Sequence, residues 1–172
     1  MADRAEGPPE LAGLTFERAI GSGGFADVFL YRQHFPSRPV AVKVLRHEHV
    51  APETIRQFEI EANVMGQISE HQFIVAIYAA GVAPDGRPYI VMEYYPGEHF
   101  GLRARGGRLQ VALVLEVAVQ ISSAMATAHA AGILHRDIKP ANILTSRSAK
   151  PGLTDFGISG THLDGVGSET AG

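Results

Sequence analysis

The sequence contains no cysteine, carries a net charge of only −3, and opens without the apolar core of a signal peptide. The absence of cysteine excludes a disulfide framework and is compatible with a reducing compartment. A slightly acidic chain has no overall basic field, which argues against a nucleic-acid partner. We find no run that approaches the ~18–20 apolar residues needed to span a bilayer. Together these absences indicate a cytoplasmic protein without a membrane segment.

What the sequence does contain is the composition of a folded domain. Hydrophobic residues make up 45% and charged residues 19% of the 172 positions, far from the signature of a disordered chain. A chain of this length can bury one sizeable core, in one or two small domains. Residues 1–13 are the exception, because proline, glycine and charged residues dominate there, and we predict a flexible tail.

Short β-prone runs, each bounded by glycine, proline or serine, fill most of the first half of the chain. The predicted strands are Leu14–Ile20, Phe25–Tyr31, Val40–Leu45, Ile74–Gly81 and Pro88–Tyr95. Between the third and the fourth, a helix is predicted to begin at Pro52, since proline is favoured at the first helical position. Its one apolar face consists of Phe58, Ala62, Met65 and Ile68, at three- and four-residue spacing.

The pattern changes at Pro96-Gly97. A Gly/Arg-rich loop is followed by Leu109–Ala131, a proline-free, alanine-rich segment that predicts a long and largely buried helix. Two short strand-like pieces come next, at Asn142–Thr145 and Pro151–Thr154. We therefore predict an α+β fold. An antiparallel β lobe with one helix covers residues 14–96, including a hinge near Glu93–Gly97, and part of a helical lobe covers residues 97–172.

A cluster of glycines lies between the first two predicted strands, in Gly21-Ser22-Gly23-Gly24-Phe25-Ala26-Asp27-Val28. Glycine lets the backbone approach a phosphate closely and present its N–H groups to it. An ordinary hairpin turn is the alternative. A dinucleotide site is disfavoured because its glycine loop runs into a helix, and a Walker-A loop is excluded because no Gly-Lys-Ser/Thr follows.

A lysine, Lys43, follows the apolar residues Val40-Ala41-Val42 of the third predicted strand. Burying an ammonium group is costly without an anion, so a buried Lys43 requires a counter-charge. Glu61 and Glu59 on the predicted helix compete for that role, and we prefer Glu61 because Met65 lies one turn along the same face. The alternative is a lysine on an edge strand that faces water.

Two polar motifs follow the long helix. The first is His135-Arg136-Asp137-Ile138-Lys139-Pro140-Ala141-Asn142, and the second is Asp155-Phe156-Gly157. Asp137 can accept a proton or orient a hydroxyl, Lys139 can neutralise a phosphoryl group, and Asn142 offers an oxygen to a hard cation. Asp155 adds a carboxylate of the kind that holds Mg²⁺. Chance charges in a polar loop, and a simple turn, are the alternatives.

The four motifs, in this order, make the chain resemble a bacterial serine/threonine protein kinase of the eukaryotic-like type, from about Leu14 onward. The resemblance implies ATP and Mg²⁺ as cofactors and a serine or threonine hydroxyl of a protein as substrate. It implies that Asp137 orients this hydroxyl as base, with Lys139 beside it. It also implies that Lys43 pairs with Glu61, and that Asn142 and Asp155 hold Mg²⁺.

By the same likeness, the adenine ring lies against the hinge. Met92 is implied to be the gatekeeper, while the Glu93 carbonyl and the Tyr95 N–H meet the edge of the ring. The residues implied to contact ATP are Ile20, Gly21, Ser22, Gly23, Val28, Ala41, Lys43, Met92, Glu93, Tyr95 and Leu144.

The likeness also carries an expectation about the end of the chain. No Ala-Pro-Glu-like segment occurs between Gly157 and Gly172, so we expect an incomplete helical lobe that ends in the activation loop. We hypothesise that these residues alone bind nucleotide weakly, with an exposed apolar surface open to self-association. The alternative is a non-catalytic nucleotide-binding regulatory or interaction module. Ser168 and Thr170 are candidate phosphate acceptors, with Arg136 as their partner.

Overall fold

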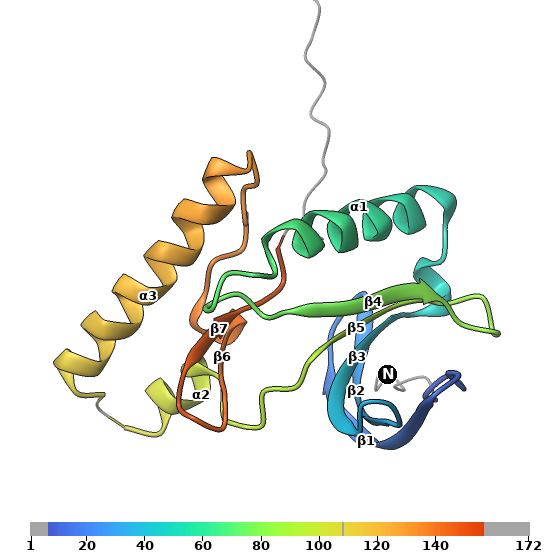
Figure 1. Ribbon diagram of the computed structural model, residues 1–172, viewed down its shortest axis with the longest axis horizontal. Helices are drawn as coiled ribbons and strands as arrows, with labels where there is room; N and C mark the ends of the chain where they lie inside the picture. Colours follow the sequence, from blue (N-terminus) through green and yellow to red (C-terminus); the bar gives the residue numbers. More distant parts are fainter. Residues whose placement is uncertain (1–6, 108, 157–172) are drawn as a thin grey trace, which may run out of the picture.

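The computed structural model describes residues 7–107 and 109–156, except for the side chains of Gln57 and Glu61. Two parts joined by the segment after Glu93 make up this region (Figure 1). The first part holds β1 (Leu14–Ser22), β2 (Ala26–Gln33), β3 (Arg38–Leu45), α1 (Pro52–Ile68), β4 (Ile77–Val82) and β5 (Pro88–Glu93). The second holds α2 (Phe100–Arg105), α3 (Val111–Ala130), β6 (Ile143–Thr145) and β7 (Pro151–Leu153). Two 3₁₀ turns, His47–His49 and Pro140–Asn142, complete the list.

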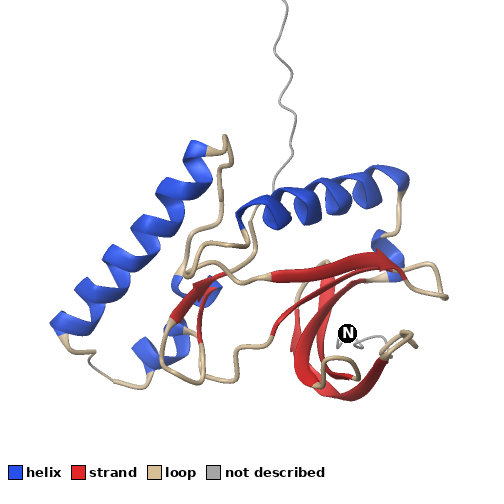
Figure 2. Ribbon diagram, viewed as in Figure 1, coloured by secondary structure: helices blue, strands red, loops and turns tan. Residues whose placement is uncertain are grey.

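The first part is a five-stranded sheet in the order β1-β2-β3-β5-β4, with every neighbouring pair antiparallel. Figure 2 shows the sheet curling, with α1 lying along one side of it. Strand residues alternate between faces, so Val40, Val42 and Val44 of β3 join one apolar cluster. Ala41 and Leu45 join the other cluster, which α1 covers. Lys43 has the same parity as these two and therefore belongs to the α1 side.

Residues 7–13 lie against the first of these clusters, so the predicted flexible tail is wrong for this stretch; residues 1–6 lie outside the described part. Leu11 is buried in the cluster, and the Tyr31 hydroxyl donates to the Pro9 carbonyl at 2.7 Å. Arg87 Nη2 donates to the Gly7 carbonyl at 2.8 Å. Local composition did not reveal this because the donors, Tyr31 of β2 and Arg87 just before β5, are distant in sequence.

Helix α1 begins at Pro52, as predicted, after an extended residue at Ala51. Its buried face consists of Phe58, Ala62, Met65 and Ile68, which confirms the apolar spacing. Phe58 and Ala62 pack with the sheet residues, while Met65 and Ile68 contact the cluster of the second part. The helix therefore contributes to both cores and ties the two parts together.

Helix α3 is buried along a single stripe, made of Val117, Ile121, Ala124 and Ala128. The prediction of a largely buried helix is therefore wrong for the region described, where Val111, Val114, Leu115 and Val119 are exposed. The helix is also long and apolar enough to cross a membrane, contrary to our estimate from the sequence; core helices meet the same criterion. The stripe packs on Phe100, Leu153 and Phe156, which supports a core helix.

Helix α2 was not predicted, because its residues fall in the stretch that we assigned to a Gly/Arg-rich loop. The His99 side chain caps it by accepting a hydrogen bond from the Leu102 N–H. Phe100, its one buried residue, packs into the core of the second part. The helix is six residues long and carries no apolar periodicity that a sequence pattern would detect.

The hinge rests on the β6–β7 hairpin at two glycines. Gly97 N–H donates to the Thr145 carbonyl at 3.0 Å, and a Cβ at position 97 would lie 2.7 Å from that oxygen. A Cβ at position 152 would lie 2.5 Å from the Tyr95 ring. Glycine is favoured at both positions, because a side chain would collide with the backbone of Thr145 at position 97 and with the Tyr95 ring at position 152.

We predict that Gly152→Ala destabilises the fold by about 1–3 kcal/mol, because the added methyl collides with the Tyr95 ring. Gly66→Ala is the matched control: it adds the same methyl on α1, where nothing lies within 4 Å. An alanine in a helix should stabilise by roughly 0.5–1 kcal/mol. Urea unfolding measures both. Equal free energies of unfolding for the two variants would contradict the close approach at the hinge.

Candidate active site

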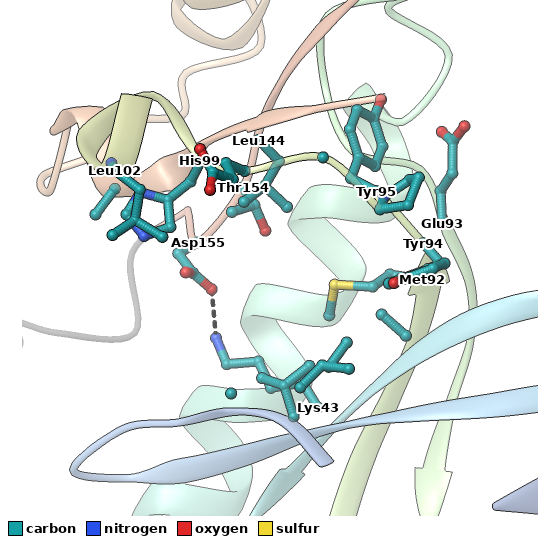
Figure 3. A pocket seen from close by; sticks show the side chains of 18 of the residues that line it. Lys43, Met92, Glu93, Tyr94, Tyr95, His99, Leu102, Leu144, Thr154 and Asp155 are labelled. Carbon is teal, nitrogen blue, oxygen red and sulfur yellow. Dashed lines mark hydrogen bonds and ion pairs between the residues drawn. The ribbon is translucent and has the colours of Figure 1, made fainter. Parts of the chain in front are cut away.

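A cavity of about 400 Å³ separates the two parts. One wall comes from β1, β2 and β3, the opposite wall from α2, Leu144 and Asp155, and the hinge closes the side between them (Figure 3). The implied ATP-contact residues found in its wall are Ile20, Gly21, Val28, Ala41, Lys43, Met92, Glu93, Tyr95 and Leu144. Apolar side chains on two sides and a polar end give it the character of a small-molecule site.

A second cavity, of about 450 Å³, continues the first under the glycine cluster. It shares Gly21, Val28, Lys43, Ala141 and Asp155 with the first. Its remaining walls are Ser22 to Ala26, Leu45, Asp137, Lys139 and Asn142. The structure thus brings the glycine cluster, the strand lysine and both polar motifs, which are distant in sequence, around one continuous space.

Lys43 and Asp155 meet where the two cavities join. Lys43 Nζ donates to Asp155 Oδ1 at 2.8 Å, and the Lys43 side chain is only 12% exposed (Figure 3). Lys43 lies on β3 and lines the cavity. Strand β7 ends at Leu153, and the segment that follows it brings Asp155 to the same cavity. Asp155 has a positive φ of 61°, a conformation that the chain adopts to turn out of the strand.

The predicted pairing of Lys43 with Glu61 stays a prediction, because the Glu61 side chain lies outside the described part. Position 61 falls three residues after Phe58 and four before Met65, both buried, whereas Glu59 is exposed. The helical register therefore supports the preference for Glu61 over Glu59.

The loop between α3 and β6 holds Asp137 in a defined position. Lys139 Nζ donates to Asp137 Oδ2 at 2.6 Å, and Asn142 Nδ2 donates to the same oxygen at 3.1 Å. Asn142 Nδ2 also donates to the Asp137 carbonyl at 2.8 Å. The hydrogen bond from Lys139 is the main cause that lowers the pKa of Asp137 below its ordinary value. Asp137 is consequently ionised at neutral pH.

His135 connects this loop to the strand that carries Asp155. Its Nε2 donates to the Thr154 carbonyl at 2.9 Å, and its Nδ1 accepts from the Asp137 N–H at 3.3 Å. The ring also packs on Phe156, with centroids 4.5 Å apart. Both ring nitrogens have fixed roles only in the neutral form, and burial lowers the pKa of His135.

The residues predicted to hold Mg²⁺ have the chemistry that this ion requires. Asp155 offers a partly exposed carboxylate, and both Asp155 and Asn142 line the second cavity. The amide nitrogen of Asn142 makes both of its hydrogen bonds to Asp137, so the amide oxygen is the atom available to a cation. One carboxylate and one amide oxygen beside a phosphate pocket suit Mg²⁺.

Several cavity residues carry no signal in the sequence. Arg18 Nη2 donates to the Tyr94 hydroxyl at 2.9 Å, which joins β1 to the hinge across the mouth of the cavity. Leu102 of α2 and His99, which caps that helix, also line the cavity. The predicted phosphate acceptors Ser168 and Thr170 lie outside the described residues.

Comparison with known proteins identifies the family in which this arrangement of residues occurs. The model of the protein kinase domain matches residues 14–168. The chain belongs to the protein kinase domain family. The crystal structure of the M. tuberculosis PknI kinase domain superposes with a TM-score of 0.74 and 32% identity, covering 86% of this kinase chain and 59% of that chain.

Two curated relatives of this kinase chain come from bacteria. The serine/threonine-protein kinase PknK of Mycobacterium tuberculosis (strain CDC 1551 / Oshkosh) is 40% identical over 154 residues, which cover 88% of this chain and 14% of that protein. The serine/threonine-protein kinase PrkC of Bacillus subtilis (strain 168) is 41% identical over 146 residues, or 82% of this chain and 22% of that protein. The chain therefore spans a minor part of these relatives.

We predict that the buried His135 makes this kinase domain less stable in mild acid. Because its pKa is lowered from the ordinary 6.5, the unfolded state binds a proton as pH falls through 6.5 while the folded state does not. Stability should therefore fall between pH 7.5 and 5.5, and His135→Gln should reduce this slope. Urea unfolding at the two pH values measures the change in the free energy of unfolding. The same change in wild type and variant would contradict the prediction.

Proposed function

We propose that this kinase domain binds ATP with Mg²⁺ and serves phosphoryl transfer to serine or threonine hydroxyls of a protein. The observation that carries the proposal is the convergence of Lys43, Asp155, Asn142 and Asp137 on one continuous space between the sheet and the second part. The apolar cavity at the hinge suits an adenine ring, and the polar cavity under the glycines suits a triphosphate.

The chemistry follows from the positions of the charges. Lys43 and the backbone N–H groups of the glycine cluster would hold the phosphates, and bound Mg²⁺ at Asp155 and Asn142 would neutralise charge on them. The substrate hydroxyl oxygen attacks the γ-phosphorus, the bond to the leaving ADP oxygen breaks, and the hydroxyl proton passes to Asp137. A carboxylate with a lowered pKa is a weak base, so orienting the hydroxyl is its principal task.

Lys139 has a place that resembles the serine/threonine subclass and a charge that suits phosphoryl transfer. It lies two residues after Asp137, and its ammonium already reaches the Asp137 carboxylate at 2.6 Å. From this place it can turn to the transferring phosphoryl group and offset its charge. The two curated relatives above carry the serine/threonine name, which agrees with this assignment.

We predict that Asp137→Asn lowers phosphotransfer by about 10²–10⁴-fold, because the carboxylate that orients the hydroxyl and accepts its proton is lost. The affinity for ATP should largely remain, since Asp137 is absent from the lining of the hinge cavity within the described residues. Transfer of labelled phosphate from ATP to a generic basic protein measures the first, and calorimetry the second. Transfer that survives the substitution would exclude Asp137 as the base. ATP binding without any transfer by the wild type would instead favour a regulatory nucleotide-binding module.

The metal site gives a further prediction. Adding Mg²⁺ should strengthen ATP binding to the wild type, and Asp155→Asn should abolish most of that gain because one carboxylate ligand is lost. In the absence of Mg²⁺ the variant should bind ATP no worse than the wild type, since the substitution removes the Lys43–Asp155 ion pair that competes for Lys43. Calorimetric titrations with EDTA or with Mg²⁺ measure all four affinities. An unchanged Mg²⁺ gain in the variant would rule out Asp155 as a ligand.

A further inference from the structure

A buried ion pair lies beside the glycine cluster and has no part in the chemistry above. Arg46 Nη2 contacts Asp27 Oδ1 at 3.0 Å, and Arg46 Nε donates to Asp27 Oδ2 at 3.2 Å. The side chains are 3% and 1% exposed. Removing both charges from water is expensive, so a pair of this kind is weak evidence for stability and directs attention to what it positions.

The pair joins three segments at the two arms of the glycine-rich loop. Asp27 lies at the start of β2, and Ser22 ends β1. Arg46 directly follows β3 and donates from Nη2 to Ser22 Oγ at 2.6 Å. One guanidinium therefore binds both arms at once, and its fork geometry fixes their separation.

The tip of the loop, Gly24 and Phe25, contacts the same short segment that follows β3. Arg46 N–H donates to the Phe25 carbonyl at 3.1 Å, and His49 Nε2 donates to the Gly24 carbonyl at 2.9 Å. The Phe25 and His49 rings lie 4.8 Å apart. Residues 46–49 thus contact the loop at its two arms and at its tip.

The glycines cannot hold the loop in place by themselves. Gly21, Gly23 and Gly24 are exposed and have no side chains to pack, yet the loop forms the roof of the polar cavity. Arg46 lies three residues after Lys43 on the continuation of the same strand. A contact between Arg46 and the loop therefore fixes the distance between the loop and the Lys43 ammonium.

We propose that Arg46 is a positioning residue for the triphosphate. Through Asp27 and Ser22 it holds the glycine-rich loop at the distance from Lys43 at which the loop N–H groups and the Lys43 ammonium contact the same phosphates. The proposal rests on the proposed binding of ATP. It concerns the phosphate end, because the loop residues that this segment contacts, Ser22, Gly24 and Phe25, line the polar cavity and, within the described residues, not the hinge cavity.

The test compares two ligands that share the hinge cavity and differ in phosphates. Dissociation constants for MgATP and for adenosine are measured by calorimetry on the wild type and on Arg46→Met. We expect the variant to bind MgATP about tenfold more weakly and adenosine within about twofold of the wild type, the scale of one lost charge-assisted hydrogen bond. Arg46→Lys, which keeps the charge, should recover part of the loss. Arg32→Met is the matched control, because this exposed arginine of β2 pairs with Glu17 at 2.9 Å, away from the loop.

A second variant keeps the test decisive if Arg46→Met leaves Asp27 unpaired and unfolds the chain. Asp27→Leu with Arg46→Met replaces the whole pair by apolar side chains, which is often neutral for stability. The proposal expects this double variant to lose MgATP affinity and keep adenosine affinity. The proposal is overturned if the double variant has the wild-type ratio of MgATP affinity to adenosine affinity, whether both affinities are kept or both fall together. A wild type that binds adenosine but not MgATP, or neither, would refute the proposed function itself.

Discussion

The contact on which the site depends is the 2.8 Å ion pair between Lys43 and Asp155, whose two partners lie 112 positions apart in the sequence. The ammonium comes from the middle strand of the sheet and the carboxylate from the segment that leaves β7. Their meeting requires that the alternation of side chains along β3 turn Lys43 to the α1 side, and that the segment after β7 reach the same cavity. An ammonium that is mostly buried also needs an anion nearby. Asp155 supplies this anion, in the place that a phosphate can later occupy beside Lys43.

The placement of the two parts is secured by close contacts at glycine as well as by charge. The hinge rests on the β6–β7 hairpin through Gly97 and Gly152, and α1 contributes residues to the cores on both sides. His135 then links the loop of Asp137 to the strand of Asp155 by two hydrogen bonds. Catalytic geometry in this family's fold is thus supported by neighbours that take no part in the reaction, which is the general requirement for a precise site.

Most of the local structure followed from sequence patterns. The five strands of the sheet and the start of α1 at Pro52 were predicted, because alternation, turn residues and helical spacing are properties of neighbouring residues. Strand Ile77–Val82 begins three residues later than predicted, since Ile74 instead pairs with Leu153 in an isolated bridge. The errors have one cause in common. The tail at 7–13, the short helix α2 and the exposed sides of α3 depend on which distant surfaces are present to cover them.

The sequence by itself determined the chemistry of this protein: a glycine cluster, a lysine in a strand, and the polar residues Asp137, Asn142 and Asp155 in an order that identifies a protein kinase domain. Only the tertiary structure decided which of these groups meet. It brought Asp155 to Lys43, placed His99 and Arg18 in the wall of the hinge cavity, and buried Arg46 against Asp27 and Ser22. The physical reason is that residue types and their spacing are local properties, whereas contacts across the cavity depend on how the whole chain packs.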